Sequence, residues 1–141
     1  MSAGPFFLAP VDVSGARLAG LLAGAGLPAQ LDADGDVRIE DPSGLRLFLT
    51  VDPQRHILTC FTVLGMRATA DELTRLRFVN RLNTGRLLVR FSQDAPDSLF
   101  CDVQVPYTQG ISVAQLLDYL RLVSAVVRSL VAEDPDGLLD A

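Results

Sequence analysis

The sequence predicts an α+β domain in which one antiparallel sheet packs against helices. Apolar residues make up 49% of the 141 residues, enough for a single core of ordinary size. Several runs typical of strands follow one another across short turns, which indicates an antiparallel meander. Segments with helical spacing of apolar residues precede, interrupt and close these runs. The expected order is helix, three strands, helix, two strands, helix, in one domain over residues 1–141 with flexible ends at 1–10 and 134–141.

The first helix is expected over residues 14–25, with Ser14 as a candidate N-cap. Its apolar stripe comprises Leu18, Leu21, Leu22 and Ala25. A strip of small residues, Ala16, Gly20 and Gly24, follows at a spacing of four. Each interior glycine costs about 1 kcal/mol relative to alanine. Either close packing of this helix offsets that cost, or the helix ends early near Gly20.

Three strands are expected next, over residues 37–40, 45–51 and 57–64, because turn sequences beginning at Asp41 and Asp52 separate them. Two further strands are expected over 86–92 and 99–107. Cys60 and Cys101 fall within these runs, about forty residues apart and without a CxxC pair. We therefore expect both to be buried, reduced packing residues.

The middle helix is expected to begin at a capping box formed by Thr69 and Glu72. Its inward-facing residues are predicted to be Leu73, Leu76, Val79 and Leu82. Three arginines are predicted to lie away from that stripe: Arg75, Arg77 and Arg81.

The closing helix has the clearest pattern, with Ser112 and Gln115 placed as a second capping box. Apolar residues follow helical spacing from Val113 to Val131. A second apolar set, Tyr119, Leu122 and Val126, lies on a flank that would face solvent in a monomer. This pattern predicts a helix that is sandwiched or paired with a second copy, so a homodimer is expected.

The sequence offers little chemistry for an enzyme. The single histidine, His56, lies in a turn, and a pairing with Cys60 would span about 13 Å along a strand. The acidic turn that starts at Asp32 lacks the glycine and glutamate positions of a calcium loop. No catalytic residue, metal site or cofactor is therefore predicted. The net charge of −5 disfavours nucleic acid as the main partner.

The first ten residues carry neither a basic residue nor a long apolar run. Neither a signal peptide nor a membrane span is expected there, and we expect a cytoplasmic protein. The segment Phe6-Phe7-Leu8 is either a strand that caps the core or an exposed docking peptide.

Most of the chain resembles the YbjN-like bacterial family, described as sensory-transduction regulators. In the first half, the resemblance lies in a helix ending at Gly26-Leu27-Pro28, then Asp34-Gly35 and residues 45–51. Two stretches of the second half carry it further. The first is 76–83, followed by Gly85 and Arg86, and the second is 100–106, followed by Gly110-Ile111-Ser112 and the closing helix. The resemblance implies a fold similar to the class I chaperones of type III secretion. Those chaperones are small acidic homodimers that hold unfolded segments of client proteins on apolar patches.

The leading hypothesis is a non-catalytic, chaperone-like or adaptor homodimer that binds a partner protein through apolar surface. The predicted partner and dimer surface comprises Phe48, Leu58, Leu88 and Phe100 on the outer sheet face, with Tyr119, Leu122 and Val126 on the closing helix. The alternative is a stress or transcription regulator associated with nucleic acid, with phosphate contacts from Arg75, Arg77 and Arg81. The sequence does not identify the partner, the pathway or the geometry of the dimer.

Overall fold

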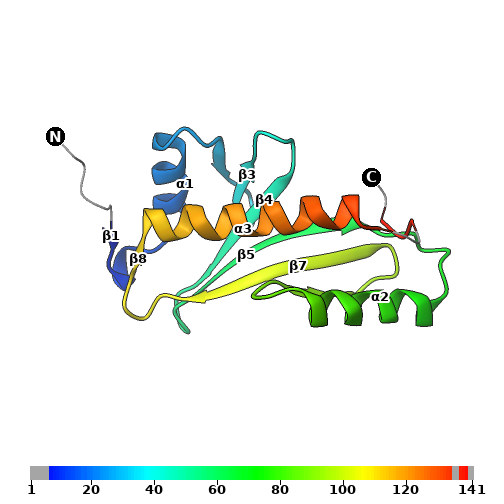
Figure 1. Ribbon diagram of the computed structural model, residues 1–141. Helices are drawn as coiled ribbons and strands as arrows, with labels where there is room; N and C mark the ends of the chain where they lie inside the picture. Colours follow the sequence, from blue (N-terminus) through cyan, green and yellow to red (C-terminus); the bar gives the residue numbers. More distant parts are fainter. Residues whose placement is uncertain (1–6, 135–136, 140–141) are drawn as a thin grey trace.

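The computed structural model describes residues 7–134 and 137–139 (Figure 1). Six strands form one antiparallel sheet in the order β2-β3-β4-β5-β7-β6. Their bounds are Ala29–Leu31 (β2), Val37–Glu40 (β3), Arg46–Asp52 (β4), Ile57–Gly65 (β5), Arg90–Ser92 (β6) and Ser98–Pro106 (β7). The helices are Gly15–Gly24 (α1), Glu72–Gly85 (α2) and Val113–Ala132 (α3). A two-stranded ribbon joins Phe7–Leu8 (β1) to Ile111–Ser112 (β8), with a 3₁₀ turn over Pro10–Asp12 (η1).

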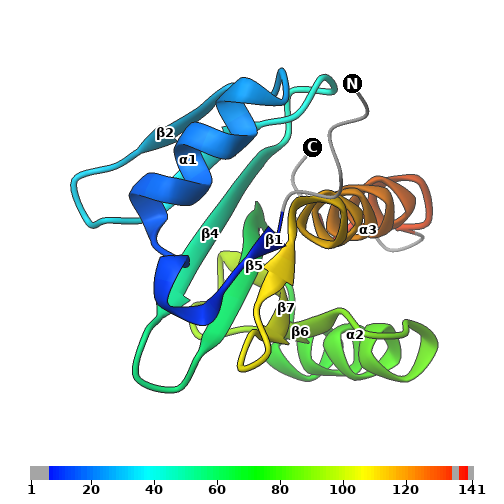
Figure 2. The same ribbon diagram turned by 90° about the vertical axis from the view of Figure 1, so that its left-hand side faces the viewer.

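The sheet has a covered face and an open face, because successive side chains along a strand point in opposite directions. The covered face carries the buried residues Ile39, Leu49, Cys60, Cys101 and Val103. Helix α1 packs on β2, β3 and β4, α3 packs on β5 and β7, and α2 packs on β6. Figure 2 shows α2 and α3 on the same side of strands β5, β7 and β6. One hydrophobic core therefore lies between the sheet and the helices, and the α+β fold expected from the sequence is confirmed.

The closing helix begins where the sequence predicts. The Ser112 hydroxyl accepts a hydrogen bond from the Gln115 backbone amide, and the Gln115 side-chain oxygen accepts one from the Ser112 backbone amide. Gly110, just before this cap, has a positive φ of 87°. A Cβ built at Gly110 would lie 2.5 Å from the Leu8 carbonyl oxygen, so only glycine lets β1 approach β8 here.

Helix α2 differs from its prediction in both its start and its buried face. It begins at Glu72 with Asp71 as its N-cap, in place of the predicted capping box of Thr69 and Glu72, and the Asp71 carboxylate accepts a hydrogen bond from the Thr74 amide. Leu73 and Leu76 are 53% and 49% exposed, so their predicted inward orientation is wrong. The buried residues are Arg75, Phe78, Val79 and Leu82, which share one helical stripe.

The hydrogen bonds of Arg75 accompany this change in the buried face of α2. Its guanidinium donates to the backbone carbonyls of Ala68 and Ala70, in the loop that leads into α2. An arginine that satisfies two carbonyls in this way can be buried, whereas the sequence pattern treats every arginine as a surface residue.

The strand expected over residues 86–92 is shorter in the structure. Leu88 has a positive φ of 69°, and the Val89 amide donates to the Leu87 carbonyl in a tight three-residue turn. Because this turn breaks the extended conformation, only Arg90–Ser92 pair with β7. Strand β2, which the sequence pattern does not reveal, adds an edge beside β3.

Helix α1 continues to Gly24, so the early end near Gly20 is wrong. The predicted strip of small residues faces solvent, and a Cβ at Gly20 or Gly24 would meet nothing within 4 Å. Close packing within a single copy therefore does not offset the cost of these two glycines.

Both ends of the described chain dock onto the core. Leu8 is buried, and β1 pairs with β8, so this part of the N-terminal segment caps the core, whereas Phe6 lies outside the described residues. At the other end, Leu138 is buried, and the Asp134 carboxylate accepts hydrogen bonds from the backbone amides of Leu138 and Leu139. The described residues 137–139 therefore pack against the domain, and the flexibility expected for this end stays a prediction.

Candidate functional site

Two of the four residues predicted for the outer sheet face lie there, and two do not. Phe48 and Phe100 do lie on the open face, and each is half-buried. Leu58 is only 1% exposed and lies on the covered face with Cys60, because residues two apart on a strand share a face. Leu88 is 73% exposed but lies in the turn before β6 and belongs to no face of the sheet. The placement of Leu58 and Leu88 on the outer face is therefore wrong.

The apolar flank of α3 is covered by the protein's own core. Tyr119, Leu122 and Val126 are half-buried and pack against the hydrophobic core. This flank is therefore partly covered within a single copy, since α3 lies over both β5 and β7, and its part in a dimer stays a prediction.

A row of stacked phenylalanines crosses the open face. The ring centroids of Phe48 and Phe61 are 5.2 Å apart, and those of Phe61 and Phe100 are 5.1 Å apart. The three side chains lie on neighbouring strands β4, β5 and β7, and none belongs to the hydrophobic core. Val63, beside them on β5, is 49% exposed. We call Phe48, Phe61, Phe100 and Val63 the aromatic patch.

Charged side chains lie on both sides of this patch. Arg38 on β3 is the cross-strand neighbour of Phe48, and Arg90 on β6 is the neighbour of Asp102 on β7. Asp102 is 1% exposed, and its carboxylate accepts two hydrogen bonds from the Arg90 guanidinium, at 3.0 Å from Nε and 2.7 Å from Nη2. These hydrogen bonds and the charge of Asp102 raise the pKa of Arg90. Arg90 itself is 60% exposed, so the buried carboxylate holds an arginine at the surface.

The three arginines predicted to contact phosphate differ in their exposure on α2. Arg75 is buried against loop carbonyls, so its predicted surface position is wrong. Arg81 lies over the Phe78 ring, with 5.9 Å between its guanidinium carbon and the ring centroid. Arg77 is exposed. The predicted phosphate contact is thereby reduced to Arg77 and Arg81, which are both exposed and lie one turn apart on α2.

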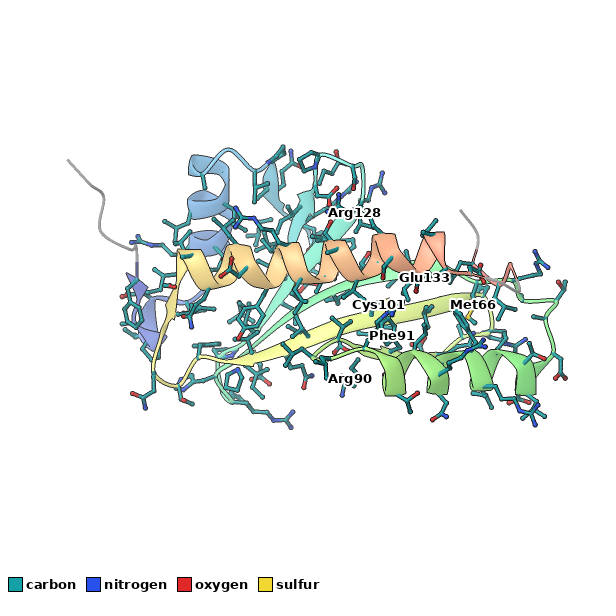
Figure 3. The ribbon with its side chains drawn as sticks, in the orientation of Figure 1. Met66, Arg90, Phe91, Cys101, Arg128 and Glu133 are labelled. Carbon is teal, nitrogen blue, oxygen red and sulfur yellow. The ribbon has the colours of Figure 1, made fainter. Side chains whose placement is uncertain are left out.

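A groove of about 400 Å³ lies between the end of α1, the β3–β4 turn and α3. Ile39 and Leu120 line it, and Arg121 and Arg128 lie at its α3 wall. Figure 3 shows Arg128 on the side of α3 away from α2, and Cys101 in the layer between these two helices.

Asp41, which also lines the groove, ties the β3–β4 turn to α3. Burial acts to raise the pKa of Asp41, but hydrogen bonds from Ser124, Ser43 and two backbone amides outweigh it and hold the pKa below its ordinary value. The carboxylate is thus occupied in joining the turn to the helix.

The buried thiols are poor nucleophiles. Burial, together with the nearby charge of Asp102, raises the pKa of Cys60 and of Cys101 to about 12. Within residues 7–134 and 137–139, no group of three His, Cys, Asp or Glu side chains is placed to hold a metal ion. Among the helices that the structure describes, none is long and apolar enough to cross a membrane.

Comparison with protein families gives a match over most of the chain. The model of the YbjN family, described as "Putative bacterial sensory transduction regulator", matches residues 14–133. The chain belongs to the YbjN family. The resemblance in the sequence is thereby confirmed. No match is found among functionally curated proteins.

Solved structures share the fold of this YbjN-family chain. YbjN from E. coli, described as "a putative transcription regulator", superposes with a TM-score of 0.71 at 15% identity, covering 92% of this chain and 96% of its own. The ExsC–ExsE complex gives a TM-score of 0.65 at 16% identity, covering 87% and 94%. The Yersinia pestis type III secretion chaperone SycH, in complex with a fragment of YscM2, gives 0.57 at 19% identity, covering 82% and 98%. The resemblance to type III secretion chaperones in fold is confirmed.

Proposed function

We propose that this YbjN-family protein is a non-catalytic module that holds a segment of a partner protein on the open face of its sheet. The observation that carries the proposal is the aromatic patch, three phenylalanines stacked across three strands outside the hydrophobic core. Aromatic side chains contribute a large area to an interface and lose little conformational entropy on binding. A partner that covers the patch would bury apolar surface that the monomer leaves in contact with water.

The fold supports a role in protein binding. ExsC–ExsE and SycH–YscM2 are complexes between two proteins, and each superposes on most of this chain. Fold alone does not determine function, so the site on the open face carries the weight of the proposal. The two free, buried thiols suit a reducing compartment, and we place the protein in the cytoplasm.

Self-association forms part of the same proposal. Leu73 and Leu76 lie one turn apart on the outer side of α2, and both are about half-exposed. An exposed apolar pair on a helix is a natural contact for a second copy. We therefore place the homodimer contact on α2, while Tyr119, Leu122 and Val126 serve the core of each copy.

Affinity capture with paired variants tests the binding face. Phe48→Thr with Phe61→Thr removes both stacking contacts of the aromatic patch, and threonine retains the preference for strand conformation. We expect the wild-type protein, but not this double variant, to retain its partner from the native lysate at high salt. Circular dichroism and thermal unfolding establish that the variant is folded.

Val11→Thr is the matched control, because Val11 is 89% exposed in η1, away from the sheet. It should retain the same partner as the wild type. If the double variant captures the same proteins as the wild type, the open face is not the binding site.

A further inference from the structure

The strand register places two arginines at opposite ends of one row of residues. Across β3, β4, β5, β7 and β6, successive cross-strand neighbours are Arg38, Phe48, Phe61, Asp102 and Arg90. Neighbouring strands lie ~4.8 Å apart, so the four steps separate the two arginine backbones by about 19 Å. The row has an arginine at each end and two phenylalanines between them, and its fourth member, Asp102, is buried beneath Arg90.

Both arginines retain capacity to bind a ligand. Arg38 lies 4.0 Å from Glu40, a loose pair in which both side chains are substantially exposed. At Arg90, Nε and Nη2 donate to Asp102, which fixes the guanidinium and directs the remaining nitrogen, Nη1, elsewhere. A fixed guanidinium loses less entropy when it binds a carboxylate than a freely rotating one.

The row matches an extended peptide in length and in chemistry. An extended chain rises ~3.3 Å per residue, so side chains six residues apart and on the same face are about 20 Å apart. Two apolar side chains between them, about 6.6 and 13 Å along the peptide, would lie near Phe48 and between Phe61 and the buried Asp102. Nucleic acid fits poorly, because its closely spaced phosphates would meet an apolar centre and a protein with a net charge of −5.

We propose that the partner segment held on the open face is extended, with an acidic side chain at each end of an apolar pair, where the acidic groups bind Arg38 and Arg90. This inference rests on the proposed function and adds the chemistry of the partner. It also assigns Asp102 the role of positioning Arg90.

Selection from a random dodecapeptide library displayed on phage tests the inference, with the intact protein as bait. Enriched peptides should carry Asp or Glu at two positions about six residues apart, with apolar residues between them on the same face. Fluorescence anisotropy of an enriched peptide should then show roughly tenfold weaker binding when both acids become Gln, since two charge-assisted hydrogen bonds are lost. The difference should shrink at high salt.

Two protein variants complete the test. Arg38→Gln leaves every buried group paired, and Arg90→Lys keeps the charge beside Asp102 but removes the fixed guanidinium. Both variants should bind the acidic peptide more weakly than the wild type does, and should bind its Gln version with unchanged affinity. Arg77→Gln, on the exposed side of α2, should change neither affinity.

The outcomes separate the inference from the proposed function. Enriched peptides that are apolar without acids, and that depend on Phe48 and Phe61 but not on Arg38 or Arg90, would overturn the inference and leave the proposed function standing. Peptides enriched equally by the wild type and by the Phe48→Thr, Phe61→Thr variant would overturn both.

Discussion

At the residue scale, the Asp41–Ser124 hydrogen bond joins the β3–β4 turn to α3. We expect Ser124→Ala to lower the free energy of unfolding by about 1 kcal/mol at pH 7. Because the pKa of Asp41 is lowered in the folded state, its contribution is present above the ordinary carboxyl value of 3.8 and is lost as pH falls below it. Urea unfolding of both proteins at pH 7 and pH 3 should show the difference shrinking at the acidic pH.

Ser129→Ala is the control for this prediction. The Ser129 hydroxyl donates to the Val126 carbonyl within α3 and, among the residues that the structure describes, makes no hydrogen bond to a carboxylate. Its effect should not depend on pH over this range, and an equal pH dependence for both variants would contradict the assignment to Asp41.

The two cysteines give a second prediction at this scale. With pKa values of about 12, Cys60 and Cys101 should hardly react with a disulfide reagent at pH 8 while the protein is folded. Labelling should be fast in urea and, in its absence, should follow the rate at which the protein opens. The raised values also mean that stability falls as pH rises from about 9 towards 12, since unfolded thiols ionise first. Rapid labelling of the native protein at pH 8 would show that the thiols are accessible.

Residue-level features were the hardest to predict. The pairing of Asp102 with Arg90 depends on strands β6 and β7 being neighbours in a defined register. Phe61 was visible in principle, because alternation from the buried Cys60 places it on the opposite face. Arg75 was not, since its burial depends on carbonyls in a loop whose path no periodic pattern specifies.

At the element scale, the start of a helix can be predicted from local sequence when the capping side chain hydrogen-bonds to a backbone amide within the first turn. Ser112 and Gln115 meet this condition, and the predicted start of α3 is correct. At α2, two candidate caps compete within three residues, and the Asp71 carboxylate takes the role predicted for Thr69.

Substitutions at the two candidate caps of α2 test this choice. Asp71→Ala should lower the free energy of unfolding by about 1 kcal/mol, because the Thr74 amide loses its acceptor and the first turn loses a favourable negative charge. Thr69→Ala should change it by less than about 0.5 kcal/mol, as expected of a surface substitution. Thermal and urea unfolding measure both. A larger loss of stability for Thr69→Ala than for Asp71→Ala would show that Thr69, as first predicted, caps the helix.

At the scale of the whole molecule, the sequence predicts the order of the main elements because alternation, helical spacing and turn residues agree with one another. The edge strand β2 and the short β1–β8 ribbon escape prediction, since each has two or three residues and depends on a partner strand for its conformation. The exposed or buried state of α3's flank also depends on packing, which is why the sequence could not predict that Tyr119, Leu122 and Val126 are partly buried against the core.

The proposed dimer gives a prediction at this scale. Leu73→Gln with Leu76→Gln should convert a dimer into a folded monomer, because both side chains lie on the exposed side of α2. Leu122→Gln should instead lower stability without changing the mass, because Leu122 packs against the core. Light scattering coupled to size exclusion measures the mass. A mass unchanged by the α2 variant would remove α2 as the contact.

Hydroxyl-radical footprinting of the protein, free and with its captured partner, tests the central claim most directly, because it reports on individual side chains. The account predicts that Phe48, Phe61, Phe100 and Val63 are oxidised in the free protein and protected in the complex, while Val11 is oxidised equally in both. Protection confined to the groove beside α3, with the aromatic patch oxidised as in the free protein, would contradict it.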